Sequence, residues 1–185
     1  MTQFTSKYDS IISNEQLDFD KIVLAQKIIY ALQNEVQSYV DVGHGPFLCA
    51  IYDDKGNLIS KCANSVVNDT CSICHAEINA IKEAEKKLGT YDLSRFNLTI
   101  YVTSEPCMMC LGAILWSGIK EIYYGVQSKD VEAITGYDEG FKPNWFEEFA
   151  KRGISAYGNI EADLGKEVLK KYVRDGHVIY KPLRK

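Results

Sequence analysis

The chain has 185 residues, of which 46% are hydrophobic and 25% are charged, a composition typical of one globular domain. The formal net charge is −4, which argues against a function based on non-specific binding to nucleic-acid backbones. No apolar run reaches the roughly 20 residues that a membrane span needs. The first 16 residues lack a secretory pattern, so we expect a cytoplasmic protein whose six cysteines are thiols or metal ligands.

The predicted elements alternate between strands and helices. In chain order they are a helix at 19–40, strands at 47–52 and 58–63, a helix at 75–88, a strand at 97–103, a helix at 108–116, strands at 121–126 and 154–157, and a helix at 163–173. This order predicts an α/β fold, a three-layer α/β/α sandwich around a mixed five-stranded sheet. We find no linker and expect a single domain over residues 1–185, with residues 1–17 as a loose N-terminal extension.

Two short motifs carry the chemical information. One is His75-Ala76-Glu77, and the other is Pro106-Cys107-Met108-Met109-Cys110. From this composition, His-x-Glu is expected about 0.2 times by chance and Pro-Cys-x-x-Cys only about 0.004 times. Each motif opens a predicted helix that follows a strand and a loop, which is a context suited to a metal site.

The residue types predict a zinc site with an open position. Two thiolates and one imidazole give Zn²⁺ three protein ligands and leave the fourth tetrahedral position to water. Thiolates are favoured at a helix N-terminus, where Cys107 and Cys110 are predicted to lie. Glu77 is predicted to lie beside the water, where a carboxylate can accept and transfer a proton.

The pair of motifs resembles the signature of the zinc-dependent cytidine/deoxycytidylate deaminase superfamily, and the resemblance extends over about residues 42–139. The string from Thr103 to Ile114 is most similar to bacterial guanine deaminases and next to tRNA adenosine deaminases. The resemblance implies a cytidine deaminase-like fold and one Zn²⁺ per chain on His75, Cys107 and Cys110. It also implies that Glu77 acts as proton shuttle in the hydrolytic deamination of guanine to xanthine and ammonia, and that the enzyme is a homodimer.

The same resemblance implies where the base binds. We expect substrate contacts from five residues: Phe47, Asn64, Ala76, Asp138 and Glu139. The aromatic ring would stack on the base and the amide would hydrogen-bond the purine. The acidic pair follows Gly136-Tyr137, where guanine deaminases carry Gly-Phe-Asp-Asp, and would select guanine through its N–H donors.

Several alternatives stay open at this point. Cys71-Ser72-Ile73-Cys74-His75 matches a haem-attachment pattern, and four cysteines (71, 74, 107 and 110) could form a closed structural zinc site without catalysis. Guanosine, cytosine, cytidine and tRNA adenosine are alternative substrates, although the acidic total charge argues against tRNA. The aromatic residues at 145–149 are interpreted as a packing or dimer patch, or as a substrate lid. Tyr180 lies five positions inside the C-terminus, whereas short members of the family end in an aromatic residue that closes a neighbour's cavity.

Overall fold

The computed structural model describes residues 18–141 and 143–181, so the prediction for residues 1–17 lies outside the described residues. The elements, in chain order, are α1 (Phe19–Val40), β1 (Leu48–Tyr52), β2 (Leu58–Ala63), α2 (Ala76–Leu88), the 3₁₀ helix η2 (Leu93–Arg95), β3 (Thr99–Ser104), α3 (Met108–Ser117), β4 (Glu121–Val126), α4 (Ser128–Thr135), α5 (Trp145–Ala150), β5 (Ser155–Tyr157) and α6 (Ala162–Arg174). All nine predicted elements are present, with ends that move by two residues at most.

The strands form one mixed sheet in the order β2-β1-β3-β4-β5. Strand β1 runs antiparallel to β2 and to β3, whereas β3, β4 and β5 are parallel. The parallel strands β3 and β4 therefore end at the same edge of the sheet. The two helices that follow them along the chain, α3 and α4, begin at this edge.

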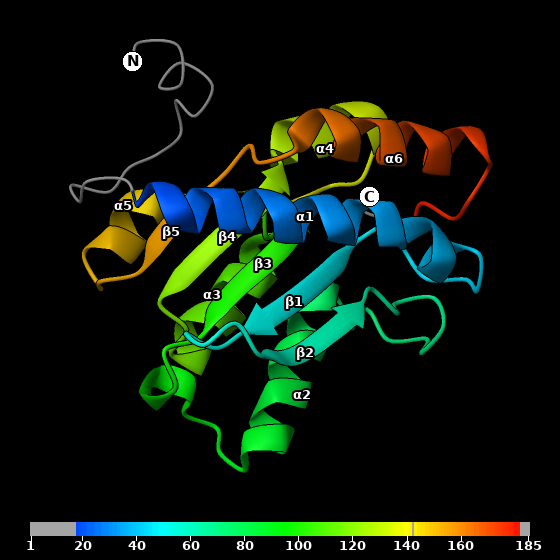
Figure 1. Cartoon of the computed structure of the whole chain (residues 1–185). Coiled ribbons are helices and arrows are strands. Elements are labelled where there is room, and N and C mark those ends of the chain that lie inside the picture. The colour runs from blue at the N-terminus through cyan, green and yellow to red at the C-terminus, as the bar shows by residue number, and fades with distance from the viewer. Residues whose placement is uncertain (1–17, 142, 182–185) are drawn as a thin grey trace, which may run out of the picture.

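Helices cover both faces of the sheet, as predicted (Figure 1). On one face, Ile51, Ile100 and Ile122 pack against α2, α3 and α5. On the other face, Tyr101 and Tyr123 pack against α1 and α6. Since successive side chains of a strand point to opposite faces, the alternating apolar residues of β3 and β4 supply both cores.

Two α-helices, α4 and α5, and the short 3₁₀ helix η2 are absent from the sequence-based predictions. Helix α5 has only six residues and is held by packing, because Trp145 and Phe149 are buried in the core that α2 and α3 form. The packing interpretation of the aromatic patch at 145–149 is therefore supported over the lid interpretation.

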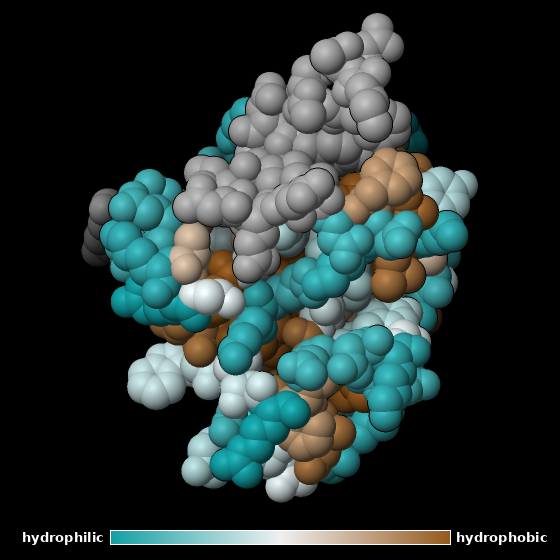
Figure 2. Space-filling view, turned by 60° about the vertical axis from the view of Figure 1, so that its left-hand side comes forward, coloured by the Kyte–Doolittle hydropathy of each residue, from teal (hydrophilic) through white to brown (hydrophobic). Residues whose placement is uncertain are grey.

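Polar residues cover most of the described surface on the side of the molecule in Figure 2, and apolar residues show between them. None of the described helices is both long and apolar enough to cross a membrane.

Candidate metal centre and adjoining cavity

The residues of the two motifs meet where two helices begin. His75 is the N-cap of α2 and Cys107 the N-cap of α3, each with an extended backbone. Helices α2 and α3 pack on the same face of the sheet, so their N-terminal ends come together. Cys110 lies in the first turn of α3 and is buried.

The three side chains have the spacing that one zinc ion requires. The Nδ1 atom of His75 lies 3.5 Å from the Sγ atom of Cys107 and 3.7 Å from that of Cys110, and the two sulfur atoms are 3.6 Å apart. Tetrahedral bonds of about 2.3 Å to sulfur and about 2.0 Å to nitrogen place ligand atoms about 3.5 to 3.8 Å apart. The geometry therefore fits a zinc ion with three protein ligands.

The surroundings of Cys107 favour the thiolate, which is the form that binds metal. Hydrogen bonds from Cys110 and His75 lower the pKa of Cys107 to about 4, which favours the thiolate.

Among the described residues, no other group of three His, Cys, Asp or Glu side chains lies as close together. Cys71 and Cys74 are outside the group, and all six cysteines are free. The described residues thus lack a four-sulfur zinc site.

Glu77 lies two residues after His75, within the first turn of α2, and is buried. It is not part of the ligand group but lines the cavity beside it. Burial raises the pKa of its carboxyl group. A buried carboxylate next to a metal position can receive and return a proton. Ala76, between the two, is fully buried in the core and is not among the cavity-lining residues; its role as a substrate contact stays a prediction.

A cavity of about 320 Å³ opens beside the three ligands. It is lined by four of the five predicted substrate contacts, namely Phe47, Asn64, Asp138 and Glu139. It is also lined by residues that the sequence analysis did not assign to the site: Ser72, Ser104, Glu105, Met108, Met109, Tyr137, Gly140, Tyr180 and Lys181.

The side chain of Asn64 is held by two hydrogen bonds. Its Oδ1 atom accepts a hydrogen bond from the backbone N–H of Val66 at 3.3 Å, and its Nδ2 atom donates to the hydroxyl of Tyr180 at 2.8 Å. Gly45 leaves room for the amide, because a Cβ atom at this position would lie 2.8 Å from Oδ1 of Asn64.

Aromatic rings form one wall of the cavity. The ring of Tyr137 lies 5.7 Å from that of Phe47 and 5.1 Å from that of Tyr180. The hydroxyl of Tyr180 lies 3.5 Å from the Nε2 atom of His75. The C-terminal segment therefore reaches the cavity of its own chain, through an aromatic residue near the end of the sequence.

The comparisons with known proteins agree with this geometry. The family model of the cytidine and deoxycytidylate deaminase zinc-binding region matches residues 24–126. The guanine deaminase of Bacillus subtilis is 39% identical over 97 residues, 52% of this chain and 60% of the relative. The tRNA-specific adenosine deaminase of Buchnera aphidicola is 39% identical over 103 residues, 56% of this chain and 63% of the relative. The chain thus spans about three fifths of the length of these relatives.

Solved structures match over more of the chain. The structure of the guanine deaminase from Nitrosomonas europaea has a TM-score of 0.76 and 32% identity, and the match covers 88% of this chain and 96% of that one. A structure in complex with 2,6-diaminopurine has a TM-score of 0.79 and 35% identity, with 85% of both chains covered. The cytidine deaminase-like fold is thus confirmed, and with it the zinc cofactor, for which His75, Cys107 and Cys110 are positioned. This chain belongs to the cytidine and deoxycytidylate deaminase family, whose zinc-binding region it carries.

Proposed function

We propose that this protein catalyses the hydrolytic deamination of guanine to xanthine and ammonia. The observation that carries the proposal is that one cavity of about 320 Å³ is lined by two of the three metal ligands (His75 and Cys107), by Glu77 and by the pair Asp138–Glu139. This volume is near the lower limit for small-molecule sites and suits a free base. The similarity to the guanine deaminase from Nitrosomonas europaea supports the same substrate class.

The acidic pair gives a physical reason for preferring guanine. Guanine presents N–H donors beside the carbon that reacts, and a carboxylate accepts hydrogen bonds from them. Adenine and cytosine present acceptor nitrogens there, which a carboxylate repels. We assign this selection to Glu139, which is half-buried, with Asp138 beside it. Phe47 offers a ring face for the base, and the amide of Asn64 can donate or accept.

The charge of the cavity disfavours substrates that carry phosphate. Four carboxylates line it, from Glu77, Glu105, Asp138 and Glu139. Among the described residues that line the cavity, Lys181 is the one basic side chain other than the metal ligand His75. A polyanion such as tRNA needs clustered positive charge. The free base is therefore the better fit.

The mechanism assigns the proton transfers to Glu77. When bound, zinc acts as a Lewis acid that lowers the pKa of a water molecule toward about 7. Glu77 accepts a proton from the attacking water as the oxygen bonds to C2 of guanine, and then passes this proton to a ring nitrogen. Glu77 next carries the second proton of the water to the amino group, the C2–N bond breaks, and ammonia leaves. Guanine and water thus give xanthine and ammonia with no other reactant.

We also propose a homodimer in the cytoplasm. Trp116, at the end of α3, is 87% exposed, and its neighbour Leu115 is 39% exposed. Large apolar side chains that are exposed together favour a protein interface. The six free cysteines support a reducing compartment. Light scattering tests the dimer: Trp116→Asp should give the monomer mass, and a wild-type monomer would refute the dimer.

A substrate panel tests the function. Zinc-loaded protein is mixed with guanine, guanosine, adenine, cytosine or cytidine, or with a tRNA, and ammonia release is measured, with Glu77→Ala as the matched control. We expect guanine to react fastest and the control to be silent. Faster turnover of another compound would keep the zinc chemistry and remove Asn64, Asp138 and Glu139 as guanine selectors. Silence with zinc bound would contradict the proposal.

A further inference from the structure

Glu105 links the segment that carries the zinc ligand Cys107 to two helices, α4 and α5. It lies two residues before the metal ligand Cys107 and lines the cavity itself. Its Oε2 atom accepts a hydrogen bond from the backbone N–H of Ser128 at 2.9 Å, and its Oε1 atom accepts one from the indole Nε1 of Trp145 at 3.0 Å. Its own backbone N–H donates to the carbonyl of Val126 at 2.7 Å. The carboxylate of Glu105 thus joins the segment before Cys107 to the first residues of α4 and α5.

In the sequence, the two donor residues flank the acidic loop at 136–141. Ser128 is the first residue of α4 and Trp145 the first residue of α5, and Asp138 and Glu139 lie between these helices. Helix α4 is continuous and ends at Gly136, which has a left-handed backbone with φ of 75°. The position at which α4 begins therefore sets the position at which the loop begins.

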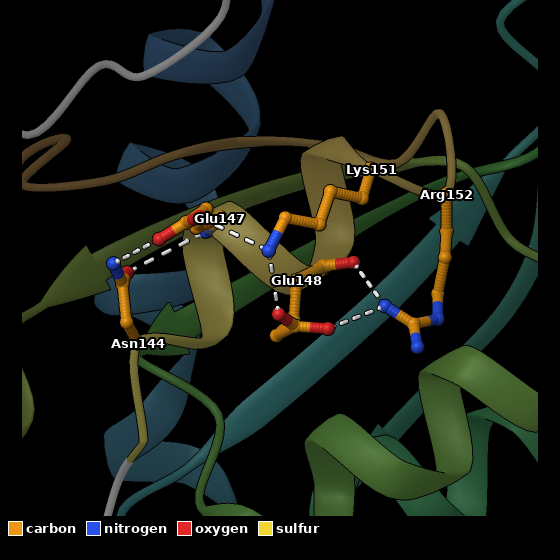
Figure 3. A network of polar contacts seen from close by, with 5 residues as sticks. All are labelled: Asn144, Glu147, Glu148, Lys151 and Arg152. Atoms are coloured by element: carbon orange, nitrogen blue, oxygen red, sulfur yellow. Dashed lines mark hydrogen bonds and ion pairs between the residues drawn. The ribbon is translucent and has the colours of Figure 1, made fainter.

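Helix α5 has support of its own, apart from Glu105. Figure 3 shows a network of side chains around it, from Asn144, Glu147, Glu148, Lys151 and Arg152. Asn144 caps the helix by donating to Glu147 at 2.9 Å and accepting from its backbone N–H at 3.5 Å. Lys151 pairs with both glutamates, at 3.0 Å and 2.9 Å. Each exposed ion pair contributes little to stability alone. Together with the cap and the buried Phe149, these pairs should keep α5 formed when the indole N–H of Trp145 is removed.

We propose that Glu105 is a positioning residue for the deamination proposed above: it holds the acidic loop at 136–141 at a fixed place relative to the zinc ligand Cys107. The inference deepens the proposed function and rests on it, because the loop is assigned there to base selection. A carboxylate suits this role since each of its oxygens can accept a hydrogen bond from a different helix, and bonds to a charged acceptor are stronger than neutral ones. A glutamine has a single acceptor oxygen.

The chain offers variants that remove one contact at a time. Glu105→Gln keeps the size of the side chain and loses one acceptor. Trp145→Phe removes the indole N–H and keeps an aromatic ring. Ser128→Pro removes the backbone donor at the first position of a helix, where proline is tolerated, and Gln127 already has the extended backbone that precedes proline (φ −69°, ψ 147°). Ser128→Ala keeps the N–H and is the matched control.

We expect each of the three contact variants to raise KM for guanine about tenfold, equivalent to about 1.4 kcal/mol of binding free energy. The value of kcat should change less than about threefold, since Glu77 and the metal ligands stay in place, and each variant should keep one zinc per chain. Ser128→Ala should raise KM less than Ser128→Pro, because it keeps the backbone N–H that donates to Glu105. Adding Trp145→Phe to Glu105→Gln should raise KM by less than the product of the single effects, because the two residues share one contact.

A role in stability alone would lower the melting temperature of the contact variants and leave KM unchanged, and this result would overturn the proposal. Loss of zinc in Glu105→Gln would also overturn the proposal, because the substitution would then act on the zinc ligand Cys107 and not on the acidic loop.

Amide hydrogen exchange of residues 136–141, measured without substrate, tests the positioning role of Glu105 independently of the assignment of guanine as substrate. Exchange should rise in Ser128→Pro and Trp145→Phe, and it should rise more in Ser128→Pro than in Ser128→Ala. If wild type does not deaminate guanine but exchange rises as described, the substrate assignment fails and the positioning role stands. Unchanged exchange overturns the positioning role.

Discussion

Replacing Gly45 by alanine tests whether the site depends on the position of the Asn64 amide. The added Cβ atom would lie 2.8 Å from Oδ1 and 3.0 Å from Cγ of Asn64, closer than side chains tolerate. The amide cannot move freely, because it donates to Tyr180 and accepts from the backbone of Val66. Relief of the clash therefore requires that at least one of these hydrogen bonds lengthens.

The expected cost follows from this geometry. Overpacking of a well-packed site costs about 1–3 kcal/mol, and in a domain of this size each kcal/mol lowers Tm by about 2–4 °C. The displaced amide should also bind the base less well, so we expect KM for guanine to rise about tenfold, as for the loss of one hydrogen bond. Urea unfolding and steady-state xanthine formation measure the two effects.

A double-mutant cycle with Asn64→Ala is the control. In the Asn64→Ala background the nearest remaining atom is Cβ of residue 64, which would lie 3.3 Å from the new methyl group. The Gly45→Ala change should then cost much less free energy of unfolding than in wild type. If Gly45→Ala lowers the free energy of unfolding equally in both backgrounds, or does not lower it in wild type, the clash with the Asn64 amide is refuted.

Three further predictions concern the chemistry of the site. Glu77→Ala should keep one zinc per chain and lose kcat by about 10²–10⁴-fold, the usual range for a general acid–base group; metal analysis and xanthine absorbance test this, and loss of zinc would make Glu77 a ligand. Glu139→Gln should lower kcat/KM for guanine by about tenfold to a hundredfold, since a hydrogen bond to a charged group contributes about 1.5–3 kcal/mol; unchanged steady-state kinetics would remove Glu139 from selection. Cys107→Ser, or chelation of the wild type, should remove zinc, abolish xanthine formation and lower Tm in calorimetry, because a ligand that binds only the native state stabilises it; full activity without metal would contradict the zinc assignment.

Most of the elements that the sequence analysis identified carry a local apolar pattern. Helix α1 repeats apolar residues over 22 positions, and strands β3 and β4 each carry apolar side chains for both faces of the sheet. Helix α5 carries no such pattern, because its six residues are too few for two helical repeats and depend on tertiary burial of Trp145 and Phe149. Helix α4 has eight residues, and of its buried ones only Val131 is apolar.

The candidate metal ligands could be predicted because each motif is contiguous in sequence and the two motifs together are rare by chance. Tyr180 and Glu105 could not be assigned, since their contacts join residues far apart in the chain. Tyr180 lies 105 positions from His75, and Glu105 lies 40 positions from Trp145. Such contacts follow from the sheet order and from the return of the chain after α6, which local patterns do not specify.

The proposed hydrolysis of guanine at C2 is tested most sharply by the product that forms in ¹⁸O-labelled water. Zinc-loaded protein is incubated with guanine, and xanthine and ammonia are quantified by mass spectrometry and a coupled assay. We predict xanthine with one ¹⁸O atom at C2 and ammonia in a 1:1 ratio. Guanine recovered unchanged from protein that carries one zinc per chain would contradict this proposal.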